Sequence, residues 1–323
     1  MDDITLVTRS ELKTIAGSLH EARQLIAHGV YRRVLHGIYV DDTVPDSPEL
    51  RRAALERVLP AEAVLSGRAA LWAMGVDVLP LDGTLDVTTV RGRHLEKRPG
   101  MTPHSALLPD DELVELPNGL LVVSAPRAFV DVARRESLVE AVALGDAVLR
   151  SGAATAEELE AAVERAAGLR GIVGARTVVP HLEPRSESQG ESRLRMSLVL
   201  GGLPRPEAQV DYYTEDGEHL ARVDLVVRGV LMEYDGREQR LKKPVFVQDR
   251  RRQNSIVDRG AELRRYSSED VAWVRRGWLC DEVMRAIAAA ASRPPAALRR
   301  GRDTLRPPRL SPLPTLAELR RAA

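Results

Sequence analysis

The chain has very little cysteine, few aromatic residues and no excess of charge of either sign. Cys280 is the single cysteine among 323 residues, so neither an intrachain disulfide nor a cysteine-rich zinc site can form. Lysine plus arginine and aspartate plus glutamate number 47 each, so any nucleic-acid-binding surface must be local. No apolar run approaches the roughly 20 residues that span a bilayer, and the opening residues, with Asp2 and Asp3, do not resemble a secretion signal. We therefore expect a soluble, cytoplasmic protein without membrane contact.

Several common catalytic motifs are also missing from the sequence. It contains no Walker-type glycine loop that ends in Lys-Ser or Lys-Thr, and no His-Glu-x-x-His zinc motif. The seven histidines are scattered and show no Ser-His-Asp pattern. These absences leave P-loop hydrolases, zinc peptidases and serine hydrolases without support.

A chain of this length exceeds one ordinary hydrophobic core, so two or three domains are expected. The pattern predicts an α/β protein, α+β overall. A winged-helix-like domain at 1–45 is followed by a mixed α/β middle domain at 46–182. A C-terminal domain at 186–290 reads as helix, β-hairpin, helix, strand, helix, with a mixed sheet flanked by helices. Residues 183–186, Glu-Pro-Arg-Ser, are interpreted as a linker, and residues 291–323 as an extended tail rich in proline and arginine.

The first domain shows the pattern of a winged helix. Thr8 and Ser18 each begin a capping-box sequence at the start of a helix. A basic, β-rich stretch at 30–40 follows, as a wing would, and Arg32 and Arg33 within it are candidates to contact DNA phosphates. A small helical cap followed by a hairpin, with no role in DNA binding, is the alternative.

An acidic cluster is expected in the C-terminal domain. Two apolar runs flank Arg228-Gly229, and an antiparallel hairpin that turns there places Asp224 opposite Glu233. Directly opposed residues share a sheet face, and Asp235 joins Glu233 on it because the strand period is two. Carboxylates gathered in this way repel one another, and a divalent cation such as Mg²⁺ would offset them. A three-residue turn would shift the register and move Asp224 off this face, and exposed acids on an outer face remain the alternative.

Two neighbouring segments add to this cluster. The helix expected from about residue 188 carries Glu191, which can supply a fourth carboxylate, although an isolated glutamate is more often a surface residue. Arg250, Arg251 and Arg252 form a basic run after the hairpin. Carboxylates that bind a metal beside a basic segment suit a phosphodiester substrate, whereas a charge run alone is more often a solvated face.

These residues carry a resemblance to a known family. The stretches that carry it are Glu191-Ser192-Arg193-Leu194-Arg195, Gly202-Leu203-Pro204, Gln209-Val210, Arg222-Val223-Asp224-Leu225, Glu233-Tyr234-Asp235-Gly236, Asp249-Arg250-Arg251-Arg252-Gln253-Asn254 and Arg264-Arg265-Tyr266-Ser267-Ser268-Glu269-Asp270-Val271. In this order they resemble the domain family related to the very-short-patch-repair endonuclease, within the PD-(D/E)xK superfamily. The resemblance implies a restriction-endonuclease-like fold that covers a quarter to a third of the chain.

The same resemblance implies roles for the acidic residues. Glu191, Asp224 and Glu233 would bind Mg²⁺ (or Mn²⁺), and Asp235 stands where other branches of the superfamily carry lysine. All four would then be catalytic residues. Family members often carry histidine shortly after the Asp-Gly pair. Gln239 occupies that place here, and glutamine cannot act as a general acid or base.

The N-terminal region is similar to another family, the AbiEi-type antitoxins. The similarity lies in residues 8–12, 33–40 and 63–70. It implies a winged helix that binds promoter DNA and a protein that counters a nucleotidyltransferase toxin.

Two functions follow from these resemblances. The leading hypothesis is a metal-dependent DNA endonuclease that docks through its winged helix. The alternative is a non-enzymatic DNA-binding regulator or antitoxin of a type IV toxin–antitoxin system, with an inactive nuclease fold. A stand-alone structural protein is disfavoured by the clustered acids. The sequence gives neither the DNA target nor the oligomeric state.

Overall fold

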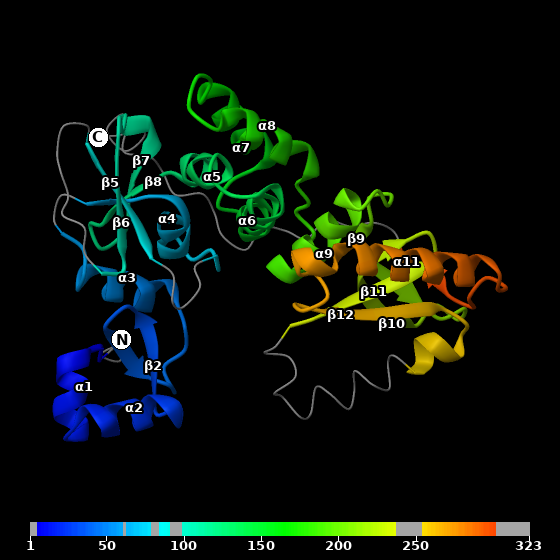
Figure 1. Cartoon of the computed structure of the whole chain (residues 1–323), viewed down its shortest axis with the longest axis horizontal. Helices are drawn as coiled ribbons and strands as arrows, with labels where there is room; N and C mark the ends of the chain where they lie inside the picture. Colours follow the sequence, from blue (N-terminus) through cyan, green and yellow to red (C-terminus); the bar gives the residue numbers. More distant parts are fainter. Residues whose placement is uncertain (1–4, 61–62, 79–83, 91–98, 237–253, 302–323) are drawn as a thin grey trace. The chain divides into compact units, whose positions relative to one another are not determined.

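Figure 1 shows the computed structural model of the chain, which describes residues 5–60, 63–78, 84–90, 99–236 and 254–301. The chain divides into two compact units, each described here by itself. The first comprises Met1–Arg135, Ser151–Ile172 and Leu310–Ala323, and the second comprises Glu136–Arg150 and Val173–Arg309. Helices and three mixed or antiparallel sheets build these units, which confirms the α+β class.

The first unit opens with the elements expected of a winged helix. They are β1 (Val7–Thr8), α1 (Arg9–Ala16), α2 (Leu19–Ala27), β2 (Tyr31–Leu35) and β3 (Ile38–Asp41). The strands form an antiparallel sheet in the order β1-β3-β2. Thr8 caps α1 in a reciprocal capping box with Glu11, so the helix begins where its unsatisfied backbone N–H groups find side-chain partners.

The remainder of the first unit surrounds a five-stranded mixed sheet. Its strands are β4 (Val64–Leu65), β5 (Leu85–Val90), β6 (Met101–Ala106), β7 (Leu113–Glu115) and β8 (Leu121–Val123), in the order β6-β5-β4-β8-β7. Its helices are α3 (Pro48–Glu56), α4 (Gly67–Ala73), α5 (Ala125–Ala133) and α7 (Ala156–Arg165), with a 3₁₀ turn at Asp110–Glu112. These elements form the mixed α/β region that the sequence predicts for residues 46–182.

The second unit is built on a mixed sheet. Its strands are β9 (Glu207–Tyr213), β10 (His219–Val227), β11 (Val230–Asp235), β12 (Glu262–Ser267) and β13 (Arg299–Arg300), in the order β12-β11-β10-β9-β13. The β11–β12 pair is parallel and the other pairs are antiparallel. The helices are α6 (Leu138–Ser151), α8 (Ile172–Val178), α9 (Gln189–Leu200) and α11 (Arg276–Ala291), with a helical turn at 254–258 and 3₁₀ turns at Val179–His181 and Trp273–Arg275.

Two cores lie on opposite faces of this sheet. On one face, Leu194 of α9 and Val283 of α11 pack against Leu225 of β10. On the other face, Ile256 packs against Val223. In Figure 1, α9 and α11 lie over strands β9 to β12, and the short helix near residue 256 lies on the other side. Residues on each strand therefore face one of two cores, and their alternation can be followed residue by residue.

The predicted hairpin is confirmed, and so is its register from Val227 to Leu225, whereas the expected pair of Asp224 with Glu233 is not part of the ladder. Val227 pairs with Val230, and the pairing continues to Leu225 and Met232. Arg228 and Gly229 both have positive φ, 46° and 83°. Two positive φ values are the mark of the two-residue turn whose twist matches a β-hairpin. Arginine therefore occupies a position that asparagine or glycine more often takes.

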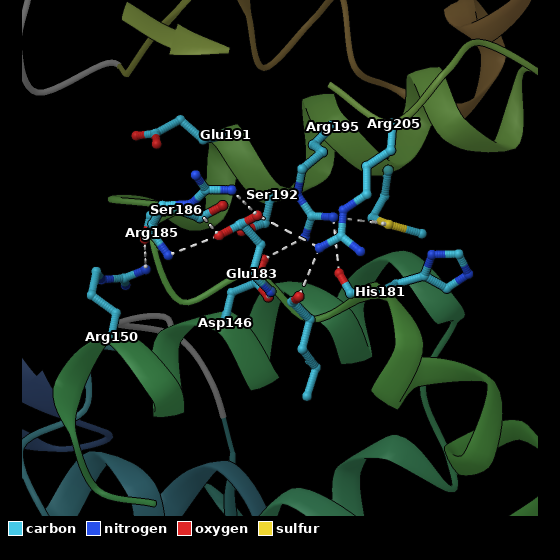
Figure 2. Close-up of polar contacts among 12 residues, drawn as sticks. Asp146, Arg150, His181, Glu183, Arg185, Ser186, Glu191, Ser192, Arg195 and Arg205 are labelled. Carbon is cyan, nitrogen blue, oxygen red and sulfur yellow. Dashed lines mark hydrogen bonds and ion pairs between the residues drawn. The ribbon is translucent and has the colours of Figure 1, made fainter. Parts of the chain in front are cut away.

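The interpretation of residues 183–186 as a linker is wrong. Glu183 and Ser186 are buried, and the Glu183 backbone N–H donates to Asp146 Oδ1 over 2.6 Å. Asp146 lies on α6, 37 residues earlier, so a partner distant in sequence fixes a segment whose composition looks like a linker. Figure 2 shows these contacts. Helix α6, which precedes the expected domain start at 186, thus belongs to the second unit.

Candidate metal-binding site

Helix α9 brings Glu191 to the site. Ser188 caps the helix, and its hydroxyl accepts a hydrogen bond from the Glu191 backbone N–H over 3.1 Å. Glu191 therefore lies in the first turn of α9, where it is 5% exposed. Its Oε2 accepts a hydrogen bond from the Glu187 backbone N–H over 2.8 Å. The Ser188 cap and the hydrogen bond from Glu187 together fix the Glu191 side chain at the start of α9.

One turn further along, a buried ion pair anchors the same helix. Arg195 Nη2 lies 2.7 Å from Asp146 Oδ2, and both side chains are fully buried. Arg195 Nη1 donates to the His181 carbonyl over 2.9 Å, as Figure 2 shows. Burial raises the pKa of Asp146 even though the Arg195 charge opposes that shift. The pair ties α9 to α6, so it sets the place from which Glu191 reaches the sheet.

Strand β9 is irregular at Gln209. Its neighbours face opposite cores, since Ala208 packs on the side of α9 and α11 whereas Val210 packs on the other side. Residues two apart in a regular strand share a face, so the strand turns over at Gln209. Gln209 has φ 56°, a left-handed conformation that non-glycine residues seldom adopt. Strand β9 therefore stores backbone strain at the candidate site.

Strand β10 turns over at the facing position, Asp224. Leu225 belongs to the core under α9, and Val223 belongs to the opposite core. The β10–β11 ladder ends at Leu225. Beyond it, Asp224 Oδ2 accepts a hydrogen bond from the Tyr234 backbone N–H over 2.8 Å. The Asp224 carboxylate thus takes the place of a backbone carbonyl at the end of the ladder.

The two irregular strands meet Glu191 at one amide nitrogen. Gln209 Nε2 donates to Glu191 Oε2 over 2.9 Å and to Asp224 Oδ1 over 3.4 Å. The structure therefore brings together two of the predicted carboxylates, from α9 and from β10, with Gln209 between them.

The electrostatics of this pair favour a bound cation. Burial, followed by the neighbouring Glu191 charge, raises the pKa of Asp224 to about 7. Burial also raises the pKa of Glu191, against hydrogen bonds from Glu187, Ser188 and Gln209. Two buried carboxylates that resist ionisation side by side gain free energy when a divalent ion neutralises them.

The other predicted acids are arranged differently. Glu233 is buried on β11 and lies in register with Arg265 of β12. Asp235 forms an ion pair with Arg265, whose Nε lies 3.0 Å from Asp235 Oδ2. Across the ranges that the structure describes, no three or more His, Cys, Asp or Glu side chains are grouped to hold a metal. Gln239 and Arg250, Arg251 and Arg252 lie outside the described residues.

The residues present fit Mg²⁺ or Mn²⁺ better than a closed transition-metal site. Mg²⁺ is commonly held by one or two carboxylates, with waters and substrate phosphates in the other positions. Glu191, which is buried, and Asp224, which is partly buried, supply two carboxylates of this kind, and a structural zinc site would need four ligands. The donor set is therefore that of an open site that a phosphate-bearing substrate can complete.

Strand β2 places the two candidate DNA-binding arginines, Arg32 and Arg33, in different surroundings. Arg32 Nη2 donates to the Val44 carbonyl over 2.8 Å. Arg33 lines a hollow of about 260 Å³ together with Arg9, Arg23 and His36. Arg33 therefore belongs to a local cationic surface, although the chain as a whole is neutral.

Comparisons with known proteins find relatives of this chain in Mycobacterium tuberculosis. No protein-family model matches it. Over 206 residues it is 32% identical to MT2308 of Mycobacterium tuberculosis strain CDC 1551 / Oshkosh and to Rv2248 of strain H37Rv. The alignment covers 62% of this chain and 70% of each relative. The chain belongs to the family of these two proteins.

A solved structure shows a more distant likeness. The crystal structure of the RV2827C protein from Mycobacterium tuberculosis matches with a TM-score of 0.29 and 18% identity. The match covers 59% of this chain and 75% of that one. A likeness at this level does not bear on the fold or the function of this family.

Three residues that build the site were given no role from the sequence. Gln209 lies in a stretch that carries the family resemblance, and its only further signal is a polar side chain flanked by apolar residues in a short β-like run. Asp146 and Arg195 lie 49 residues apart, and nothing local marks them as a pair.

One further finding concerns the helices in the described part of the chain, none of which is long and apolar enough to cross a membrane.

Proposed function

We propose that this protein is a Mg²⁺- or Mn²⁺-dependent DNA endonuclease that docks on duplex DNA through its N-terminal winged helix. The observation that carries the proposal is the convergence of Glu191 and Asp224 on the Gln209 amide nitrogen. DNA as substrate implies a cytoplasmic location.

In this function, Glu191 and Asp224 hold the ion. Glu191 is buried and Asp224 partly buried, and both accept backbone hydrogen bonds, Glu191 from Glu187 N and Asp224 from Tyr234 N, so their oxygens are preorganised rather than recruited on binding. A bound divalent ion supplies Lewis-acid stabilisation of the phosphodiester and lowers the pKa of a coordinated water. Glu233 follows Met232, the last residue of β11 in the hairpin ladder. We propose it as a third metal ligand beside Glu191 and Asp224.

Substrate binding falls to cationic groups. Arg9, Arg23 and Arg33 around the hollow of the winged helix suit phosphate contacts, which set affinity but not sequence preference. Arg250, Arg251 and Arg252, which lie outside the described residues, are proposed from the sequence alone to contact DNA phosphates.

The test is nicking of supercoiled DNA with Mg²⁺ or Mn²⁺. We expect wild type to nick, and Asp224→Asn and Glu233→Ala to lose activity while still shifting DNA in a gel. Asp216→Asn, a change at an exposed acid in the β9–β10 turn, serves as the matched control and should keep full activity. Equal nicking by Asp224→Asn and wild type would refute the site.

A second candidate function is favoured by two observations. The described residues include no group of three acids suited to a metal, and Gln239 stands where related nucleases often carry histidine. A non-enzymatic regulator or antitoxin of a type IV system, acting against a nucleotidyltransferase toxin, fits both. Wild-type protein that binds duplex DNA and Mn²⁺ without cleaving DNA, and that binds such a toxin, would establish this function instead.

A further inference from the structure

We propose that Gln209 is a placeholder for the metal ion. In the metal-free protein its amide nitrogen takes the position between Glu191 and Asp224, and it withdraws when the ion binds. The proposal rests on the metal site proposed above and concerns how that site exchanges its ion.

The geometry places the amide in the path of the ion. Gln209 Nε2 lies 2.9 Å from Glu191 Oε2 and 3.4 Å from Asp224 Oδ1. Mg²⁺ sits about 2.1 Å from each oxygen ligand, so an ion bound to these two oxygens would compete with the amide N–H groups for the same two acceptors. The amide and the ion are therefore alternative partners of this pair of oxygens.

The chemistry of the amide suits a neutral substitute for a cation. The side-chain nitrogen carries two N–H donors and no charge, and here each carboxylate receives one of them. Gln209 is 9% exposed, so water contributes little to solvating the pair. Without Gln209, the carboxylates of Glu191 and Asp224 would lose the hydrogen-bond donor that they share.

The backbone of Gln209 indicates that its position is kept for a purpose beyond sheet formation. Its φ of 56° is one of two positive values among the non-glycine residues that the structure describes, and the other belongs to the hairpin turn at Arg228. Left-handed backbone inside a strand persists where the surroundings over-determine it, and such strain is concentrated at functional sites. The turnover of β9 at this residue aims the side chain at Glu191 and Asp224.

A placeholder weakens metal binding. The ion must displace two hydrogen bonds to ionisable groups, so part of its binding free energy replaces interactions that the metal-free protein already has. A residue that merely positions the carboxylates has the opposite effect, because its loss would weaken binding. The two roles are therefore separated by the direction of the change in Mn²⁺ affinity.

The experiment measures Mn²⁺ binding to the full-length protein by isothermal titration calorimetry and by the electron paramagnetic resonance of free Mn²⁺. Two variants are compared with wild type. Gln209→Gly removes the amide and adopts positive φ without strain. Gln209→Asn keeps an amide and tolerates the same backbone, but its side chain is one methylene shorter. Circular dichroism melts without metal confirm that each variant is folded.

We expect Gln209→Gly to bind Mn²⁺ about tenfold more tightly than wild type, the effect of losing roughly one net charge-assisted hydrogen bond from the metal-free state. Gln209→Asn should fall between the two. Equal or weaker binding by both folded variants would overturn the placeholder and leave the metal site standing. Absence of Mn²⁺ binding in all three proteins would overturn the metal site and the placeholder together.

Discussion

The ring of Tyr234 lies directly against Gly190. A Cβ at Gly190 would be 1.9 Å from Tyr234 Cε1 and 2.3 Å from its Cζ, so helix α9 and strand β11 touch where no side chain fits. The Tyr234 backbone N–H also donates to Asp224. Close approach of these two elements therefore holds one carboxylate of the site in place.

Gly190→Ala is expected to disturb both the fold and the site. Tyr234 must move to admit the methyl group, and overpacking of this kind costs about 1–3 kcal/mol of unfolding free energy. The displacement of β11 should also weaken Mn²⁺ binding. Thermal unfolding with and without Mn²⁺ measures both effects. Gly174→Ala is the matched control, because this glycine lies in helix α8 with nothing within 4 Å of an added Cβ. Equal behaviour of the two variants would contradict the close packing.

The metal-free protein is expected to lose stability as the pH rises. The pKa of Asp224 in the folded protein is about 7, above its ordinary value near 4. Between these two values the folded protein holds more protons at this site than the unfolded chain, so its stability is highest below the window and falls through it.

The measurement is thermal unfolding in EDTA at pH 5 and pH 8. Between these values, wild type should lose on the order of 2 kcal/mol more than Asp224→Asn, which carries no titrating group there. Saturating Mn²⁺ should restore most of the difference at pH 8. An identical pH dependence in wild type and Asp224→Asn would show that Asp224 does not titrate in this range.

Breaking the buried ion pair is expected to be costly. Asp146→Ala leaves Arg195 charged, fully buried and without its carboxylate, and the loss of one partner of such a pair costs about 3–5 kcal/mol. The double variant Asp146→Ala with Arg195→Met should recover part of this loss, because no charge remains to be compensated. Glu49→Ala, which breaks the more exposed pair with Arg52, should cost less than about 1 kcal/mol. Thermal unfolding measures the stability of the three variants. A double variant less stable than Asp146→Ala would contradict the explanation by an uncompensated buried charge.

The two wing arginines are expected to differ in DNA binding. Arg33 shares a cationic hollow with Arg9, so replacing either by alanine should weaken duplex binding and lower the slope of log K against log salt by about 1. Arg32 is bonded to the Val44 carbonyl, so Arg32→Ala should reduce binding less. Gel shifts at several salt concentrations test this order, with Arg165→Ala, an exposed change on α7, as the control. Unchanged binding and salt slope in Arg33→Ala would remove the winged helix from the DNA-binding surface.

The parts of the structure that were predicted correctly depend on local patterns. Two apolar runs of equal length around Arg228-Gly229 leave one register that buries both, and the hairpin follows it. Thr8 and Ser18 likewise cap helices where the sequence places them.

The parts that were missed depend on contacts between residues distant in sequence. The turnover at Gln209 accompanies hydrogen bonds to Glu191 and Asp224, which lie 18 and 15 residues away, so the local sequence gives only a weak signal of it. Residues 183–186 combine proline with charged residues, as linkers do, and they are buried because Asp146 supplies the partner. The grouping of Glu191 with Asp224 was expected from family resemblance. Their link through a glutamine amide was not.

Helix α6 has a consequence for how this protein can be inherited. The chain enters the second unit at Glu136, leaves it after Arg150 and returns at Val173. A single genetic crossover therefore cannot transfer the second unit alone, because a junction before Glu136 also carries Ser151–Ile172 of the first unit, and a junction after Arg150 leaves Arg195 without Asp146. The two units are expected to pass between genomes as one coding segment, and a gene fragment that begins at 186 would encode a helix whose buried arginine has no counter-charge.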